Sequence, residues 1–471
     1  MGTTINDSGV ATIVGNDLDV IDLYHAYMGY NKGVNIIVQV VDTGVNAAHE
    51  DLVQNMDFNR SYNDNQVGDP SGTDPHGTMV AGIMAARAFN KIGVRGVIPF
   101  AKIAGSNWLN NQTYEALATV WLNGDGANEI SVSNNSWGSY ADTTTIDELI
   151  MEEGTRTLRD AKGRIYVFAA GNDRGLAGNA NLSYRLSNRY MIAVAALKHN
   201  NTYASYSTPG SNILVSGYSG DFYQNSPTIT TTTIEGNSRN YGDINTKTTF
   251  SEDVKQNYTF IMNGTSAASP TVSASIALVL EACPSLTWRD IKYLVARNAK
   301  NVDLSNDSWV QNSAGLWHSV DYGFGLINPR GMINQCLNGY ENLPVEQSQT
   351  IIQTYNMHIP DNNASILFDV NVAGVNLNVE WVEVTVDNNS TSASDYRVEL
   401  ISPAGTKTTL MSSGTRISGY FSADWMTGGF RFGSAAMIDE KSQGNWKIII
   451  RDEYAVDVGV VKSIQLKIYG H

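Results

Sequence analysis

Hydrophobic residues in the first two thirds of the chain form three short, nearly continuous runs, at residues 34–41, 165–170 and 191–197. Such runs are typical of strands that are buried on both faces of a parallel sheet. Between them lie stretches with the apolar spacing of helices, at residues 77–88, 113–122, 146–160 and 267–281. Because strands and helices alternate, the pattern predicts βαβ units and an α/β parallel sheet with flanking helices.

The pattern changes after about residue 340, where helical spacing gives way to short runs of alternating apolar and polar residues. Examples are residues 379–386, 396–401, 446–451 and 463–469. Short alternating strands separated by turn residues predict an all-β sandwich. We therefore expect two domains, 1–340 and 341–471. One segment, residues 221–258, is rich in Thr, Asn and Ser, and a loop of this length inside a compact domain is usually functional or mobile.

Composition and charge narrow the classes of partner. Hydrophobic residues make up 42% of the chain and charged residues 16%, which favours a packed globular protein. The net charge of −15 repels nucleic-acid phosphates and anionic lipid headgroups, and no apolar run approaches the roughly 18 residues that span a bilayer. We therefore expect neither a nucleic-acid nor a membrane partner. The first residues do not form a signal peptide, so the protein is either cytoplasmic or a mature form without its leader.

The chain has two cysteines, Cys283 and Cys336. Two are too few for a disulfide framework or a cysteine-only zinc site, but they are enough for one bridge. A free pair of buried thiols is the alternative, and at this point the residues do not decide between them.

Candidate catalytic residues stand where predicted elements begin or end. Asp42 follows the first apolar run, His76 precedes an Ala-rich helix, and Ser266 opens another helix in NGTSAASP. Each alone reads more simply as a capping or loop residue. Together they meet a chemical need, because a serine hydroxyl requires a base to become a nucleophile, and the base requires a carboxylate to orient it. We expect His76 to stay neutral because it lies at the amino end of a helix.

A fourth candidate, Asn172, follows the second apolar run in AAGND. Acyl transfer needs hydrogen-bond donors at the oxyanion, and an asparagine amide can supply one, as it does in a subtilisin. The backbone N–H of Ser266, at a helix amino end, would supply a second.

The segments VVDTGVNAAHEDL, HGTMVAGI, NNSWG, AAGN and NGTSAASP, in this order, resemble the subtilisin-like serine proteases across residues 15–335. The order Asp, His, Ser separates this family from the trypsin-like and α/β-hydrolase enzymes. The resemblance implies that Asp42 orients, His76 acts as base and acid, Ser266 attacks, and Asn172 stabilises the oxyanion. These roles imply a serine endopeptidase acting on proteins or peptides.

The substrate segment implied by the resemblance is Ser136, Trp137 and Gly138, whose backbone would pair with an extended substrate. The alternative is that Trp137 is a core residue. The segments LTWRDIKYLVA and YGFGLIN, and the closing GNWKIIIRDEYAVDVGVVKSIQLKIYG, resemble the kexin/furin-like proprotein convertases of the bacterial type. In that group a jelly-roll-like β-sandwich, the P-domain, follows the catalytic domain.

A preference for basic residues before the cut is implied by this group but weakened by the chain itself. Where kexin and furin carry an acidic residue after AAGN, this chain has Gly178 and Asn179. Asp142 and Asp173 remain candidate acids, although an exposed loop aspartate is usually only solvated. The competing function is a protein-binding sandwich attached to a secondary or inactive protease domain.

The resemblance also implies a calcium cofactor. NKIGVRGV is similar to a subtilisin calcium loop, so Asp51, Asn90, Ile92 and Val94 would supply oxygen ligands. The alternative is an ordinary glycine turn that Asp51 caps. Asn63, Asp64 and Asp69 are candidates for a further site.

The resemblance also implies a location, an oligomeric state and a mode of maturation for the protein. As a relative of secreted enzymes, it is expected to be an extracellular monomer whose leader has been removed. Such proteases are matured with an inhibitory pro-segment or an external chaperone. In this context Cys283 and Cys336 are expected to form a disulfide.

Overall fold

The computed structural model describes residues 33–138, 145–222, 226–236, 256–361, 364–390, 392–414, 424–456 and 458–471. It also gives the backbone of the antiparallel strands β1 (Thr3–Ile5) and β2 (Ala11–Val14). The candidate acid Asp142 and residues 223–225 and 237–255 of the predicted loop lie outside this description.

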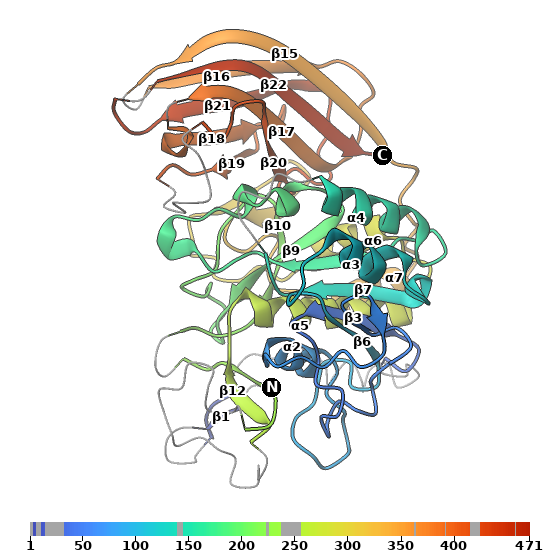
Figure 1. The fold of residues 1–471 in the computed structure, drawn as a ribbon. Coiled ribbons are helices and arrows are strands. Elements are labelled where there is room, and N and C mark those ends of the chain that lie inside the picture. Colours follow the sequence, from blue (N-terminus) through green and yellow to red (C-terminus); the bar gives the residue numbers. More distant parts are fainter. Residues whose placement is uncertain are drawn as a thin grey trace.

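The first part of the chain is built on an eight-stranded sheet in the order β10-β9-β8-β7-β3-β6-β4-β5 (Figure 1). All neighbours are parallel except β5, which returns antiparallel to β4. The strands are β3 (Ile37–Asp42), β4 (Tyr62–Asn63), β5 (Gln66–Val67), β6 (Lys102–Asn107), β7 (Ile130–Asn135), β8 (Ile165–Ala169), β9 (Met191–Leu197) and β10 (Ile213–Tyr218). Since β8, β9 and β10 are buried along their full length, their side chains are apolar or small on both faces.

Helices and short hairpins complete this part. The α-helices are α2 (His76–Ala85), α3 (Tyr114–Ala118), α4 (Ile146–Thr157), α5 (Thr265–Ala282), α6 (Trp288–Asn298) and α7 (Pro329–Leu337). The paired strands outside the main sheet are β11 (Ile229–Thr232) with β12 (Tyr258–Met262), and β13 (Trp309–Gln311) with β14 (Trp317–Ser319). Helix α5 is buried along most of its length and contacts β7, β8, β9 and β10. It therefore forms the central helix of this core.

Several predicted elements differ in their bounds from the observed ones, and two of these differences concern the first strand and the helix that became α3. The first strand begins at Ile37 rather than at residue 34, because Gly33 opens a turn in which the Ile36 N–H donates to the Gly33 carbonyl. The helix predicted over 113–122 ends early, and α3 is followed by a π-helical turn, η1 (Thr119–Asn123). The prediction of α/β architecture does not depend on either difference.

The last part of the chain is a sandwich of two antiparallel sheets, drawn in orange and red in Figure 1. The first has the order β15-β22-β17-β20, from β15 (Gln347–Ile359), β17 (Val379–Ser390), β20 (Phe430–Ser434) and β22 (Gly459–Gly470). The second has the order β16-β21-β18-β19, from β16 (Ser365–Val372), β18 (Tyr396–Ile401), β19 (Lys407–Met411) and β21 (Gly444–Asp452). Burial alternates along β16 and β21, so one face of that sheet forms the sandwich core. The predicted fold class, a parallel α/β sheet followed by an all-β sandwich, is confirmed.

The two parts share core residues. Leu182, on a 3-10 turn after β8, is fully buried in the sandwich core, whereas Trp381 of β17 is buried in the core of the first part. The neighbouring Asn181 donates its amide to the Leu410 carbonyl and accepts from the Gly433 N–H. Since α7 ends at Leu337 and β15 begins at Gln347, a boundary at residue 340 would fall in the connection, but that boundary stays a prediction.

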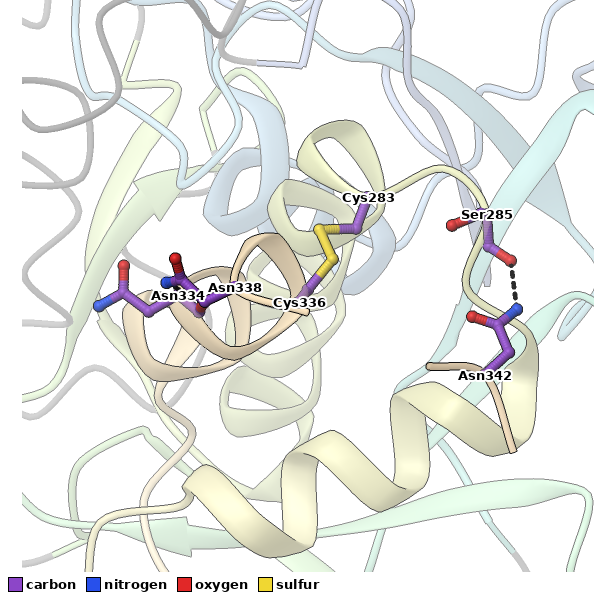
Figure 2. Close-up of a disulfide and its surroundings, with 6 residues drawn as sticks. All are labelled: Cys283, Ser285, Asn334, Cys336, Asn338 and Asn342. Atoms are coloured by element: carbon purple, nitrogen blue, oxygen red, sulfur yellow. Dashed lines mark hydrogen bonds between the residues drawn. A yellow bond between two sulfur atoms is a disulfide. The ribbon is translucent and has the colours of Figure 1, made fainter. Parts of the chain in front are cut away.

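A disulfide joins Cys283 and Cys336, as Figure 2 shows. Cys283 follows the last residue of α5, and Cys336 lies in α7. Close by, the Asn342 amide donates to the Ser285 carbonyl and fastens the connection toward the sandwich. The predicted pairing of the two cysteines is confirmed.

Candidate active site

Asp42 and His76 come together because β3 ends where α2 begins. Asp42 is the last residue of β3, is fully buried, and accepts a hydrogen bond of 2.7 Å from His76 Nδ1 at its Oδ1. The next residue, Gly77, permits this approach, since a Cβ there would lie 2.2 Å from the Gly44 carbonyl oxygen and 3.0 Å from Asp42 Cβ. A side chain at position 77 would therefore push α2 away from β3.

The charge around His76 corrects one expectation. Burial alone lowers the pKa of His76, but the charge and hydrogen bond of Asp42 and the nearby Asp74 outweigh it, so the pKa is raised above its ordinary value. The two carboxylates therefore oppose the neutral form that was predicted for His76 from its place at a helix amino end. Asp74 also accepts a 2.8 Å hydrogen bond from the His76 N–H and thereby fixes the start of α2.

Ser266 is the second residue of α5 and makes two hydrogen bonds with Ser136, which follows β7. The Ser266 hydroxyl donates to the Ser136 carbonyl at 3.0 Å, and the Ser136 hydroxyl donates to the Ser266 carbonyl at 2.9 Å. Pro270 explains the second bond, because it lacks the N–H that would otherwise reach the Ser266 carbonyl within the helix. The nucleophile candidate is thus held in a defined position, with its hydroxyl directed to Ser136 rather than to His76.

Two hydrogen-bond donors border the space beside Ser266. The Thr265 N–H and hydroxyl donate to Asn172 Oδ1 at 2.9 and 3.0 Å, which leaves the Asn172 Nδ2 group to face elsewhere. A Cβ built on Gly264 would lie 3.4 Å from Asn172 Nδ2 and 3.6 Å from the Ser266 nitrogen. Both donors therefore border one small space, and such a pair suits a developing oxyanion.

Trp137 is largely a core residue by its side chain. Its indole packs against Trp108 and Phe168, with ring centroids 4.6 and 5.5 Å away, and its Nε1–H donates to the Val41 carbonyl. The backbone continues past β7 to Gly138, which is exposed and has open space where a Cβ would lie. The Trp137 indole therefore packs against the core, as the alternative to the substrate segment had proposed. Pairing of residues 136–138 with substrate backbone stays a prediction.

The candidate calcium ligands gather around one buried carboxylate. Asp51 is fully buried; its Oδ1 accepts from the Asn90 amide at 2.6 Å, and its Oδ2 accepts from the Val94 N–H at 2.9 Å. Burial raises the pKa of Asp51, these two neutral donors only partly offset it, and the structure records no basic side chain paired with Asp51 among the described residues. A buried carboxylate with amide and carbonyl oxygens nearby fits a hard cation, provided that the Asn90 amide turns its oxygen inward.

Other observations limit the metal hypothesis. Across the described ranges, no three His, Cys, Asp or Glu side chains are grouped so that they could hold a metal ion. Two of the three residues proposed for a further site have other partners: Asn63 accepts from Asn107, and Asp69 accepts from Ser71. The carbonyls of Ile92 and Val94 and the amide of Asn90 would therefore have to complete the Asp51 site.

Sequence reasoning missed two supporting residues. Thr265 holds the Asn172 amide, and Asp74 caps the helix that carries His76. Thr265 lies inside the motif NGTSAASP, so its place beside the nucleophile was visible, but its partner, 93 residues away, was not. Together the described groups could activate a hydroxyl, stabilise an oxyanion and return a proton, which is the requirement for acyl transfer.

Comparison with known proteins identifies the families to which the two parts of the chain are similar. Residues 33–325 match the model of the Subtilase family, and residues 379–468 match that of the Proprotein convertase P-domain. The Aeromonas extracellular serine protease of Aeromonas sobria is 31% identical, over 93% of this chain and 80% of its own length. Kexin of Saccharomyces cerevisiae is 29% identical, over 97% of this chain and 54% of its own.

A solved structure shares the whole architecture. The crystal structure of the Aeromonas sobria serine protease in complex with a chaperone has a TM-score of 0.87 and 27% identity, and the match covers 100% of this chain and 93% of that one. In the described part of this chain, no helix is long and apolar enough to cross a bilayer.

Proposed function

The chain belongs to the subtilase family of serine proteases, with a proprotein convertase P-domain, and we propose that Asp42, His76 and Ser266 form its catalytic triad. The observation that carries this proposal is the 2.7 Å hydrogen bond between a fully buried carboxylate and His76 Nδ1. That bond leaves His76 Nε2 as the acceptor for a serine proton.

The proposed reaction is peptide hydrolysis through an acyl-enzyme. The Ser266 hydroxyl turns from the Ser136 carbonyl to His76 Nε2, gives up its proton, and its oxygen attacks the substrate carbonyl carbon. Asn172 Nδ2 and the Ser266 N–H donate to the resulting oxyanion. The C–N bond breaks as His76 protonates the leaving amine, and a water molecule activated by the same imidazole then hydrolyses the ester.

Substitutions at two positions test the mechanism by their effects on kcat. Ser266→Ala should abolish peptide hydrolysis, and Asn172→Ala should lower kcat by about 10²- to 10³-fold because one oxyanion donor is lost. Ser275→Ala is the matched control, since Ser275 lies on the same helix and, among the residues that the structure describes, its hydroxyl donates only to the Thr271 carbonyl. The proposal fails if Ser266→Ala retains activity or if Asn172→Ala behaves like the control.

A preference for basic residues before the cut is the finer part of the proposal. The net charge of −15 and the kexin relative support it, whereas Gly178 and Asn179 stand where kexin-like enzymes carry an acid. Cleavage-site profiling with a peptide library tests it directly. Enrichment of Lys or Arg before the scissile bond is the expected result, and enrichment of hydrophobic residues would overturn it.

Calcium binding is proposed at the oxygens of Asp51, Asn90, Ile92 and Val94. A bound Ca²⁺ would neutralise the buried Asp51 carboxylate and hold the loop at 90–94 against it. Thermal unfolding with Ca²⁺ and with a chelator is the test, because a ligand that binds only the folded state raises Tm. Asp51→Asn should remove the calcium dependence; a Tm that does not respond to calcium in the parent protein would refute the site.

Secretion, monomeric state and chaperone-assisted maturation are further proposals. The similarity to the extracellular serine protease of Aeromonas supports secretion. The solved complex of the Aeromonas protease with a chaperone supports chaperone-assisted maturation. We favour a sandwich that buttresses the protease over an independent binding module, because Leu182 and Trp381 are each buried in the core of the other part. A truncated chain, 1–340, that stayed folded and fully active would contradict this.

A further inference from the structure

Gly264 forms the turn directly before Thr265 and Ser266, and its backbone conformation is one that glycine alone adopts readily. Its φ is +82° and its ψ is 163°. A Cβ built on Gly264 would lie 3.4 Å from Asn172 Nδ2 and 3.6 Å from the Ser266 nitrogen, so this residue lies beside both proposed donors. The position of this one peptide unit therefore sets the gap between the two proposed oxyanion donors.

Two buried hydroxyl groups hold both backbone polar groups of Gly264. The Gly264 N–H donates to Tyr206 Oη at 2.8 Å, and the Ser219 hydroxyl donates to the Gly264 carbonyl at 2.6 Å. The two hydroxyls lie 2.9 Å apart, and Tyr206 also donates to the Gly220 carbonyl at 2.8 Å. Both side chains are almost wholly buried, at 4% and 2% exposure, so water does not compete for these bonds.

The hydroxyl pair is itself fixed to the central sheet. Ser219 directly follows β10, and its N–H donates to the Leu197 carbonyl at the end of β9. Tyr206 lies in the connection between those strands, where the Ala204 N–H donates to the Ala196 carbonyl. The Tyr206 ring also packs on Phe222, with centroids 4.3 Å apart. Hydrogen bonds of the Tyr206 and Ser219 hydroxyls thus connect the turn at Gly264 to the central sheet.

We propose that Tyr206, together with Ser219, is a positioning residue that holds the Gly264 turn and so sets the spacing of the two oxyanion donors, an inference that rests on the proposed function. Burial raises the pKa of Tyr206 above its ordinary value, so the phenol keeps its proton at neutral pH. Its oxygen accepts from Gly264 while its proton is donated onward, so Phe at this position removes both connections and leaves the ring packing in place.

Tyr206→Phe is the variant that tests the inference. Its kcat should fall by about tenfold or more with KM unchanged, because donors that are displaced from the oxyanion weaken the transition state and not substrate binding. Tyr166→Phe is the matched control: Tyr166 is fully buried, and its hydroxyl donates to the Trp121 carbonyl, whereas no hydrogen bond joins it to a proposed catalytic residue in the described part of the chain. A kcat for Tyr206→Phe equal to that of the control would overturn the inference.

Two further readouts separate positioning from general destabilisation. A peptide aldehyde, which forms an oxyanion with the enzyme, should bind Tyr206→Phe more weakly, whereas a noncovalent peptide should bind it as it binds the parent. On an Asn172→Ala background the loss of kcat caused by Tyr206→Phe should shrink, because one of the donors that it positions is already absent. An undiminished loss on that background would count against the role.

Two controls keep the outcomes distinct. If Tyr206→Phe does not fold, Ser219→Ala tests the same positioning of Gly264, because it removes the hydroxyl that donates to the Gly264 carbonyl. The kcat and aldehyde-binding measurements are the same. If a serine-directed inhibitor fails to label the parent protein at Ser266, the proposed function itself fails. If the parent is labelled and active but both variants match the control, only the positioning role fails.

Discussion

Replacing Asp42 with asparagine removes the charge that faces His76 while keeping the shape of the side chain. The carboxylate is fully buried and lies 2.7 Å from His76 Nδ1, whose side chain is 16% exposed, so solvent screens the pair little. An asparagine can also offer an N–H to the ring, which favours the wrong imidazole tautomer. Both effects oppose the transfer of a proton from Ser266 to His76.

The size of the effect follows from the charge separation. When His76 becomes charged in the transition state, it and the Asp42 carboxylate lie about 4 Å apart between charge centres, which at an effective dielectric constant of about 20 is worth about 4 kcal/mol. Since about 1.4 kcal/mol is a factor of ten, the charge alone contributes about 10³-fold in kcat, and the loss of the correct tautomer adds to it.

The pH dependence should change in a defined direction. In the parent protein the pKa of His76 is raised, so activity is lost on the acid side as the pH falls through that raised value. With asparagine at position 42, burial remains and the main opposing charge is gone. The acid limb of kcat/KM should therefore move to lower pH.

The assay is hydrolysis of a fluorogenic peptide between about pH 5 and 9, with Asp74→Asn as the control. Asp74 also raises the pKa of His76, but its Oδ1 caps the His76 N–H, and an asparagine oxygen can keep that bond. The control should show a small shift of the acid limb and a much smaller loss of kcat. An Asp42→Asn variant with an unmoved acid limb, or with kcat within tenfold of the parent, would refute the reasoning.

Three stability predictions are best measured in an inactive Ser266→Ala background, which prevents self-digestion. Removing the disulfide with Cys283→Ser and Cys336→Ser opens a loop of 53 residues and should cost about 4 kcal/mol, seen as a lower Tm by calorimetry; an unchanged Tm would contradict it. Leu182→Ala, which empties a fully buried position in the sandwich core, should lower the free energy of unfolding in denaturant by about 3 kcal/mol, whereas Leu182→Met should lower it by less than half of that. Equal losses would count against the role of Leu182 in joining the two parts of the chain. Burial lowers the pKa of Lys292 to about 7. Between about pH 7 and 10 the unfolded chain therefore binds a proton on Lys292 that the folded chain lacks, so the free energy of unfolding should rise with pH in this range. Lys292→Met should flatten that rise, and a free energy of unfolding that does not change with pH in the parent would contradict the prediction.

Sequence patterns predicted the elements that have a clear apolar run or a clear alternation of apolar and polar residues. The run at residues 191–197 coincides with β9, and residues 396–401 coincide with β18, because each is bounded by turn residues. The candidate triad could also be predicted, since Asp42, His76 and Ser266 each stand at a terminus of an element and within two residues of a glycine. A parallel sheet brings such ends to one edge, so their encounter required no knowledge of side-chain packing.

The features that the sequence did not predict depend on contacts between distant segments. The raised pKa of His76 reflects how close Asp42 comes once α2 packs on β3, and this outweighs the effect of burial. Pro270 lies six residues into α5, and it is accommodated by a hydroxyl from Ser136 that is remote in sequence. Likewise, Leu182 gives no sign in the sequence that it belongs to the core of the following sandwich.

Covalent labelling tests the central claim, that Ser266 is a nucleophile activated by His76. The protein is incubated with a serine-directed covalent inhibitor under calcium-replete conditions, and the modified peptide is identified by mass spectrometry. We predict one label on Ser266, greatly slowed in His76→Ala and absent in Ser266→Ala, while Ser275→Ala is labelled like the parent. No label on Ser266, or a label that is indifferent to His76, would contradict the account.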